Sequence, residues 1–204
     1  MVEKPKAITD DMKDFWGGYA VEFKLVTAEI YARHSDEIET LRKLAINLGQ
    51  GPKFLIDISR FEYVADKQDW DFDGTLIYVY SPLMIVCEKL RAICQQMPAY
   101  GPVIKRERPG SARPKDFVDI HVLAHSLEMD LAGEEMRRVL TSMFEVKKVP
   151  LSLMGLIPET YDFHLTGFAA VVDTVSPDFD LKGFDVYFNF VLKLVDQLKP
   201  VWDE

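Results

Sequence analysis

Residues 81–97 read SPLMIVCEKLRAICQQM, and this stretch predicts the helix around which the second half of the chain is organised. Ser81 is a good N-cap residue, and Pro82 would occupy the first helical position, where a missing backbone N–H is tolerated. Apolar side chains then recur three and four positions apart, which is typical of a helix with one buried face. These side chains are Leu83, Val86, Cys87, Leu90, Ile93, Cys94 and Met97. Lys89 and Arg91 flank this face on opposite sides.

The chain before this helix alternates strand-like and helix-like segments. Apolar and polar side chains alternate over residues 19–25, which is the period of a half-buried strand. The segments KFLIDIS (53–59) and LIYVY (76–80) predict two more strands, and Asp73-Gly74 predicts a turn before the second of them. Between the first two strands, Ser35 is expected to cap a helix that ends at a glycine stop. Its apolar positions are Ile38, Leu41, Ala45 and Leu48, and the stop is Gly49.

The chain after residue 97 is mostly helical by the same criterion. A loop rich in proline is expected over residues 98–114, followed by a helix over about 115–129. Two further apolar stripes, over residues 136–144 and 184–198, predict two more helices. The sequence therefore predicts an α+β protein in which a small mixed sheet precedes a helical half. We expect residues 1–82 to hold the sheet and residues 83–204 to pack on it in a single compact unit.

Composition and cysteine spacing exclude several protein classes. The chain has 204 residues, of which 48% are apolar and 28% are charged, values near those of ordinary globular proteins. Disordered tails, collagen-like fibres and membrane bundles are thereby excluded. Cys87 and Cys94 would lie about 10 Å apart along a helix, too far for a disulfide. Reduced thiols, the absence of a long apolar run and a polar N-terminal stretch predict a cytoplasmic protein.

The charge is unevenly distributed along the chain. The formal net charge is −9, so the chain as a whole repels phosphate backbones. Residues 103–115 (VIKRERPGSARPK) run against this trend, because they carry five basic side chains and a single acidic one. A basic patch on an acidic body favours a local site for a polyanion over general coating of nucleic acid.

Asp57 is the most informative single residue. It lies inside LIDIS, among strongly strand-forming residues, where a buried charge is costly unless it is paired or bound to a metal ion. The alternative is an aspartate on an edge strand that faces water. The sequence alone leaves these two interpretations equally open.

Asp116 and Asp119 form a second candidate group together with the cations beside them. They lie three positions apart, hence on one face of the expected helix. Arg113 and Lys115, at the end of the basic segment 103–115 (the basic loop), come shortly before them. The plain alternative is that acidic residues in a first helical turn complement the helix dipole.

A zinc site is the most distant of the possibilities. His121 and His125 lie four positions apart, with Glu128 three further on, a spacing that zinc can use. The H-E-x-x-H arrangement is absent, because Val122 stands where its glutamate would be. Histidines at a surface or a helix end are therefore the stronger interpretation.

Three segments taken together resemble the AbiEii/AbiGii-type nucleotidyltransferase toxins, which have a polymerase-β-like nucleotidyltransferase fold. They are KFLIDISRFEY (53–63), IYVYSPLMIVCEKLRAI (77–93) and ARPKDFVDIHVL (112–123). The EKLRA segment followed by KDFxD, after a strand that carries an aspartate, is moderately specific. The similarity covers roughly residues 19–125 and continues through KKVPLSLMG and the last helix.

The resemblance implies a role for each matching residue. Asp57 matches a metal-binding catalytic carboxylate of the family, and Lys89 matches the lysine that faces the phosphates of the nucleotide. Asp116 or Asp119 matches the final acidic residue. By the same resemblance Arg91, Arg113 and Lys115 would join Lys89 in binding a nucleoside triphosphate, with Mg²⁺ as the cofactor.

The same resemblance implies a toxin–antitoxin function and one departure from the family pattern. The implied partners are an antitoxin-like protein and an acceptor such as tRNA or another RNA. The family places a GG[ST] turn and S-x-D-x-D before the strand that carries Asp57, whereas here Gly17-Gly18 is followed by Tyr19 and a strand. We therefore expect the chain as given to be inactive or weakly active. The alternative is a non-catalytic binding module that has the same fold and engages a protein or RNA.

Overall fold

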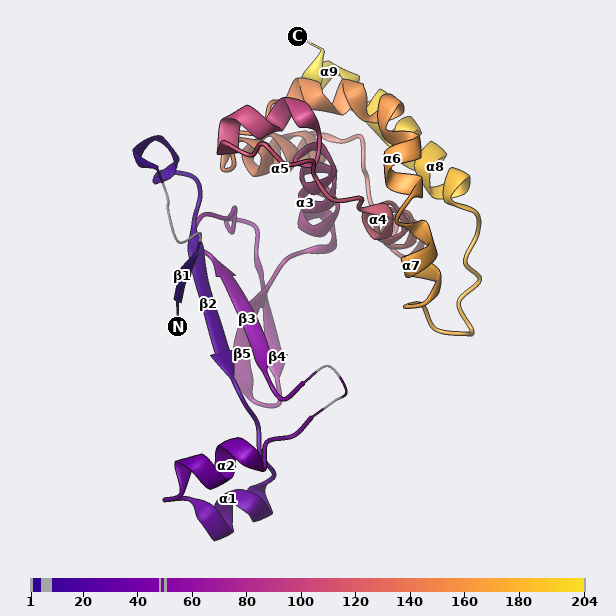
Figure 1. Ribbon diagram of the computed structural model, residues 1–204. Helices are drawn as coiled ribbons and strands as arrows, with labels where there is room; N and C mark the ends of the chain where they lie inside the picture. Colours follow the sequence, from indigo (N-terminus) through magenta and orange to yellow (C-terminus); the bar gives the residue numbers. More distant parts are fainter. Residues whose placement is uncertain (1, 5–8, 48, 50, 204) are drawn as a thin grey trace. The chain divides into compact units, whose positions relative to one another are not determined.

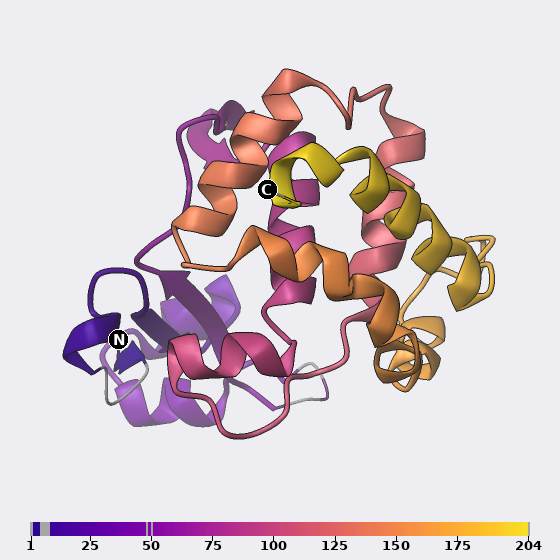
Figure 2. The ribbon, with the colours of Figure 1, turned by 90° about the horizontal axis from the view of Figure 1, so that it is seen from above.

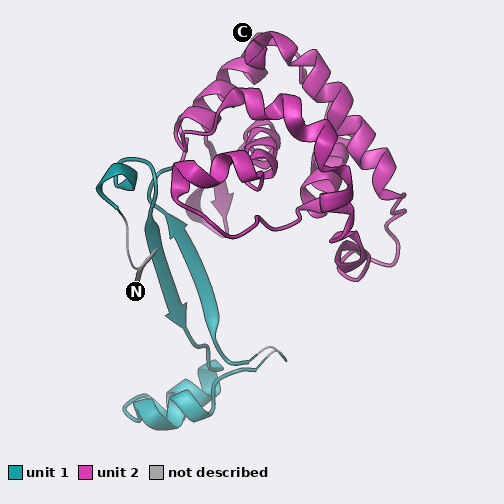
Figure 3. Ribbon diagram, turned by 45° about the horizontal axis from the view of Figure 1, so that its top comes forward, with its two compact units in different colours: residues 1–61 teal, residues 62–204 magenta. Residues whose placement is uncertain are grey.

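The computed structural model describes residues 2–4, 9–47, 49 and 51–203. The chain divides into two compact units, residues 1–61 and residues 62–204, which are coloured separately in Figure 3. Each unit is described by itself below, with the element labels of Figure 1.

Unit 1 contains a three-stranded antiparallel sheet in the order β1-β2-β3. Its strands are β1 (Val2–Lys4), β2 (Gly18–Phe23) and β3 (Phe54–Ser59). The alternating pattern predicted β2 and β3 correctly, and the register pairs Tyr19 with Ile58 and Ala20 with Asp57. At the start of β2, a Cβ on Gly18 would lie 2.1 Å from the carbonyl oxygen of Ile58, so this position requires glycine.

The helical part of unit 1 differs from the expectation. Instead of one helix over about 36–48, the structure has two short helices, α1 (Ala28–His34) and α2 (Ile38–Lys43). A further short element, η1 (Asp10–Met12), lies before β2. The side chain of Thr27 accepts a hydrogen bond from the backbone N–H of Ile30 at 3.3 Å, which starts a helix earlier than predicted. Ser35, the expected N-cap, instead ends α1. The expected position Leu48 lies outside the described residues.

Unit 2 begins with a two-stranded antiparallel hairpin of β4 (Gln68–Phe72) and β5 (Thr75–Val79). The predicted turn is confirmed: Asp73 and Gly74 both have positive φ, 50° and 78°, as the connection in a two-residue hairpin requires. The carboxylate of Asp71 accepts a hydrogen bond from the Gly74 N–H at 2.9 Å. The sequence did not predict β4, because its two aspartates are of a type that is uncommon in strands.

The rest of unit 2 is helical. It contains the helix predicted over 81–97 and the three helices predicted after it. The main helices are α3 (Pro82–Cys94), α4 (Pro114–Ser126), α5 (Glu134–Glu145) and α8 (Phe184–Gln197). Ser81 caps α3 as predicted, because its Oγ accepts a hydrogen bond from the Met84 N–H at 3.2 Å. Shorter elements not predicted are η2 (Pro98–Ile104), η3 (Leu151–Thr160), α6 (Tyr161–Leu165), α7 (Phe168–Val172) and α9 (Lys199–Trp202).

The core of unit 2 is built around α3, which packs against α4, α5 and η3 (Figure 2). Most of the apolar face predicted for this helix is buried: Val86, Leu90 and Ile93 have no exposed surface, whereas Leu83 is half-buried. Cys87 and Cys94 are free, buried thiols, as expected. Burial raises the pKa of both thiols above the ordinary range, so they stay protonated.

The α+β class is confirmed, with one difference in the arrangement of the strands. The described strands form two small antiparallel sheets rather than one mixed sheet. The reason is that β4 pairs with β5 through a tight turn and belongs to the same unit as the helices. Among the described residues, no helix is both long and apolar enough to cross a membrane.

Candidate functional site

Two neighbouring helices of unit 2 bring Lys89 and two aspartates together. Lys89 lies on α3, Asp116 and Asp119 lie on α4, and the two helices pack against each other. The Nζ atom of Lys89 donates to Asp116 Oδ1 at 3.0 Å and to Asp119 Oδ2 at 2.7 Å. The side chain of Lys89 is only 16% exposed and that of Asp116 only 6%. The structure thus joins Lys89 to the pair of aspartates that the sequence spacing already placed on one helix face.

Two more cations complete this group at the start of α4. The Nε atom of Arg113 donates to Asp116 Oδ2, and Lys115 Nζ lies 3.0 Å from both oxygens of Asp119. We call Lys89, Arg113, Lys115, Asp116 and Asp119 the α3–α4 network. Its three cations and two carboxylates leave one positive charge in excess.

The pKa values of two cations in the network, Lys89 and Arg113, are raised. Burial alone would lower the pKa of Lys89, but the hydrogen bonds and charges of Asp119 and Asp116 outweigh burial and raise it. Arg113 follows the same pattern, because its bond to Asp116 outweighs the effect of burial and raises its pKa. Lys89 and Arg113 therefore keep their charges at neutral pH.

A pocket of about 310 Å³ lies beside the network. Arg113, Lys115 and Asp116 line it from the start of α4, and the rest of its wall comes from Ala112, Pro114 and residues 167–174 around α7. The first residue of α4, Pro114, has no N–H, and the N–H groups of Arg113 and Asp116 already have partners. The two cationic side chains, rather than the backbone, are therefore the groups that this pocket can offer to an anion.

His164, on α6, supports the backbone at this end of α4. Its Nδ1 accepts a hydrogen bond from the backbone N–H of Arg113 at 3.0 Å, and its side chain has no exposed surface. Burial lowers the pKa of His164 to about 4, so the ring is neutral at physiological pH. Sequence analysis missed this residue, because an isolated histidine in DFHLT has no spacing or motif that marks it.

Arg91 lies in a different cluster of charges. Its Nη2 atom is 3.3 Å from Glu62 and 3.2 Å from Glu88, and Glu62 also binds Lys147 at 3.0 Å. The side chain of Arg91 is only 4% exposed. The structure therefore does not bring Arg91 into the network with Lys89. Glu62 and Lys147 were missed, because nothing in the sequence connects three charges that are so far apart along the chain.

Asp57 belongs to unit 1. It lies in β3, at the edge of the described sheet, and its side chain is exposed. Both interpretations of Asp57, a paired or metal-bound carboxylate and one that faces water, stay predictions. The convergence of Asp57 with Lys89, which the family resemblance implies, stays a prediction.

The described residues do not form a ready site for a divalent cation. Both oxygens of Asp116 accept hydrogen bonds from cations, and Asp119 is likewise bound by two lysines. No group of three His, Cys, Asp or Glu side chains in the described part of the chain is placed to hold a metal ion. Hard cations such as Mg²⁺ need several free oxygen ligands, so the network as it stands does not fit one.

The histidine pair has a structural explanation. The rings of His121 and His125 stack with their centroids 4.0 Å apart, and both contact the ring of Phe190. Burial and the neighbouring His125 lower the pKa of His121. The pair thus packs as an aromatic cluster between α4 and α8.

Comparison with known proteins identifies the family. A family model described as nucleotidyl transferase AbiEii toxin, type IV toxin–antitoxin system, matches residues 9–189. No curated protein and no solved structure matches the chain. The matched range covers most of the sequence and includes Asp57 and the whole α3–α4 network. The chain therefore belongs to the AbiEii nucleotidyl transferase toxin family and is a nucleotidyltransferase-like protein of the toxin–antitoxin type.

Proposed function

We propose that the α3–α4 network binds the phosphates of a nucleoside triphosphate, as part of a toxin that directs the nucleotide to an RNA acceptor. The observation that carries this proposal is the convergence of three cations on two carboxylates beside a pocket at the start of α4. Two of these cations, Arg113 and Lys115, line the pocket, where an anionic ligand can meet them.

The exposure of the three cations suggests the order in which they would contact a ligand. The side chain of Lys115 is 65% exposed and that of Arg113 is 38% exposed, whereas Lys89 lies behind them. Phosphate oxygens can replace the carboxylates as partners of the outer cations, because the guanidinium fork of Arg113 matches them geometrically. Lys89 then keeps Asp116 and Asp119 in place.

Mg²⁺ enters this proposal with the nucleotide. In proteins Mg²⁺ is commonly held by one or two carboxylates together with substrate phosphates. Asp57 is the carboxylate that the family resemblance assigns to the metal, and Asp116 and Asp119 keep their ion pairs with Lys89. Mg²⁺ affinity without nucleotide should accordingly be weak.

Binding to the network is tested by titrating the chain with a fluorescent nucleoside triphosphate at low and high salt. Lys115→Gln should weaken binding several-fold, because it removes an exposed charge that meets the phosphates. Lys193→Gln is the matched control, since Lys193 is an exposed lysine on α8 of the same unit and lies outside the network. Equal affinity for the two variants, or affinity that is independent of salt, would contradict the proposal.

Transfer is tested by incubating the chain with Mg²⁺, each labelled nucleoside triphosphate and total tRNA. We expect poor transfer, because two-metal transfer needs carboxylates that hold both ions, and those of the network are occupied by cations. Robust labelling that is abolished by Asp57→Ala would show that the chain assembles its metal site after all.

The second candidate is a non-catalytic binding module for a protein or an RNA. The observation that favours it is the same neutralisation of Asp116 and Asp119 by bound cations. Family membership points to an antitoxin as the protein partner. Triphosphate binding without transfer, together with tight binding of the antitoxin, would support this candidate.

A further inference from the structure

Helix α4 begins at a residue that cannot cap it. Arg113 holds the N-cap position, where its side chain makes no capping hydrogen bond, because a guanidinium group has only donors. In a capping box, the side chain at the third helical position accepts a hydrogen bond from the backbone N–H of the N-cap residue. Asp116 holds that third position here, but its two carboxylate oxygens are bound by the side chains of Lys89 and Arg113. Asp116 therefore serves the network, and the N–H of Arg113 needs an acceptor from elsewhere in the fold.

His164 supplies this acceptor from α6. Its Nδ1 atom lies 3.0 Å from the backbone nitrogen of Arg113, and its side chain has no exposed surface. The centroid of its ring lies 5.0 Å from that of Phe117 on α4 and 4.9 Å from that of Phe163 on α6. A neutral imidazole accepts at only one of its nitrogens, and the donor that it faces makes Nδ1 the acceptor here. Since the ring is fully buried, water does not compete for this hydrogen bond.

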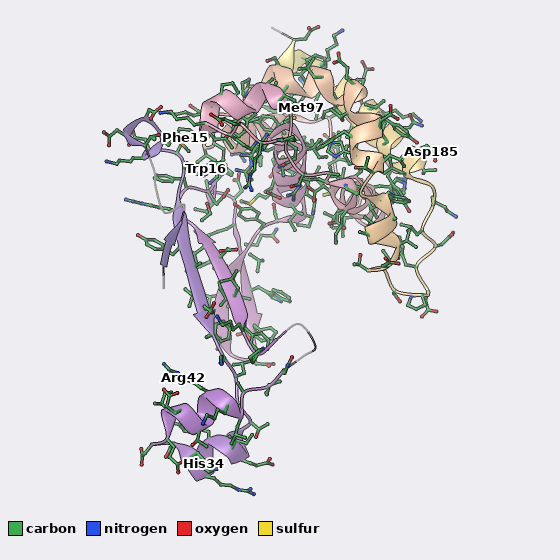
Figure 4. All side chains as sticks on the ribbon, in the orientation of Figure 1. Phe15, Trp16, His34, Arg42, Met97 and Asp185 are labelled. Atoms are coloured by element: carbon green, nitrogen blue, oxygen red, sulfur yellow. The ribbon has the colours of Figure 1, made fainter. Side chains whose placement is uncertain are left out.

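The connection between α6 and α7 is packed directly on the start of α4. A Cβ on Gly167 would lie 3.1 Å from the Cβ of Ala112 and 3.2 Å from the Cδ of Pro114, so this contact leaves little room for a side chain. The Gly167 N–H donates to the carbonyl oxygen of His164 at 3.2 Å, which ties the connection to the residue that carries the imidazole. Residues 167–174 also line the pocket beside the network, and Figure 4 draws the side chains of these helices. The same piece of the fold thus holds the start of α4 and forms part of the pocket wall.

We propose that His164 is a positioning residue for anion binding at the α3–α4 network. By accepting the hydrogen bond from the Arg113 N–H, its ring leaves the carboxylate of Asp116 to the side chains of Lys89 and Arg113. Without this acceptor, Asp116 would take over the N–H as in a capping box, and the Arg113 guanidinium would lose its partner. The guanidinium would then lose the orientation in which it lines the pocket. The inference rests on the proposed function only for its ligand, because the hydrogen bonds are tested in the free chain.

The first experiment observes the two hydrogen bonds of Arg113 by NMR in the full chain without ligand. A scalar coupling between the Arg113 backbone nitrogen and Nδ1 of His164 is expected, because a hydrogen bond joins these two atoms. The Nε–H signal of Arg113, assigned with the help of Arg113→Lys, should be protected from exchange with water by its bond to Asp116. Absence of the coupling in the unsubstituted chain would overturn the proposal.

Three substitutions of His164 separate the acceptor atom from the volume of the ring. Asparagine places a carbonyl oxygen two bonds from Cβ, where histidine has Nδ1, whereas glutamine places it one bond further and leucine has no acceptor. We expect His164→Asn to keep the Arg113 Nε–H protected, and His164→Gln and His164→Leu to lose that protection. A role in packing alone would give the opposite order, because glutamine and leucine fill more of the buried space than asparagine does. A protected Nε–H in His164→Leu would overturn the proposal, and the comparison of asparagine with glutamine decides if the leucine variant does not fold.

The second experiment measures binding of the fluorescent nucleoside triphosphate to the same variants. His164→Leu should weaken binding by up to about tenfold, the size of effect that the loss of one hydrogen bond produces, and His164→Asn should restore most of the affinity. His121→Leu is the matched control, because the His121 ring also packs on aromatic rings of unit 2, those of Tyr187 and Phe190, and lies outside the network. Equal affinities for His164→Leu and His121→Leu would contradict the positioning role.

The outcomes distinguish this inference from the proposed function. Binding that Lys115→Gln weakens and His164→Leu does not would refute the positioning role and leave the proposed function standing. Failure of every form to bind the triphosphate, with the Arg113 Nε–H protected in the expected order, would overturn the proposed function and support the hydrogen-bond arrangement inferred here.

Discussion

The ion pair between Lys89 and Asp116 should contribute measurably to the stability of unit 2. Lys89 Nζ lies 3.0 Å from Asp116 Oδ1, and the two side chains are only 16% and 6% exposed. Hydrogen bonds to charged groups contribute about 1.5–3 kcal/mol when they are shielded from water. Asp116 keeps Arg113 as a second partner, so removing Lys89 should cost less than the roughly 3–5 kcal/mol of a fully orphaned buried charge. We therefore expect a coupling energy of about 2 kcal/mol.

A double-mutant cycle measures this coupling. Lys89→Met, Asp116→Asn and the double variant are unfolded in urea and followed by the helical circular dichroism signal. The control cycle uses Arg138 and Asp66, whose side chains also meet at 3.0 Å but are 51% and 30% exposed. The exposed pair should show a clearly smaller coupling, because water screens it. A coupling for Lys89 and Asp116 no larger than that of the control would refute the argument from burial.

Three further predictions follow from individual groups. Since burial lowers the pKa of His164 from 6.5 to about 4, the unfolded chain binds this proton more tightly, and the urea midpoint should fall as the pH drops from 6.5 towards 4. The full loss in the free energy of unfolding is about 3 kcal/mol. A urea midpoint that stays constant between pH 6.5 and 4 would contradict this prediction. Ser81→Ala removes the cap of α3 and should lower the free energy of unfolding by about 1 kcal/mol. Ser81→Asp should keep most of the cap's contribution to stability, because aspartate also caps helices. Calorimetry with Mg²⁺ alone should show weak binding, and tight stoichiometric binding without nucleotide would show that free carboxylates converge on a metal.

The parts of the fold that could be predicted are those with strong local signals. Helix α3 has a capping serine, a proline at its first position and an apolar face repeated over several turns, and all three signals indicate the same helix. The hairpin turn at Asp73-Gly74 was predictable because two positive φ angles require such residues. The short elements between Leu151 and Val172 carry no comparable signal, because they are held by packing on other helices rather than by their own sequence.

The candidate site was predictable in its members but not in its boundaries. Family resemblance named Lys89, Asp116 and Asp119 for one site, and the structure brings these three side chains into contact, although sequence spacing alone places only the two aspartates together. The same resemblance added Arg91, which faces Glu62 and Glu88 instead. Which side of a helix meets which neighbour depends on tertiary packing, and no periodicity within α3 specifies that.

Arg113 has two attachments that belong to different parts of the molecule. Its side chain is bound to Asp116 in the network, and its backbone N–H is bound to the ring of His164 on α6. Residues that share a hydrogen-bonded partner usually show coupled rather than additive effects on stability. Substitutions at His164 and at Asp116 should therefore depart from additivity, although the two residues lie on different helices.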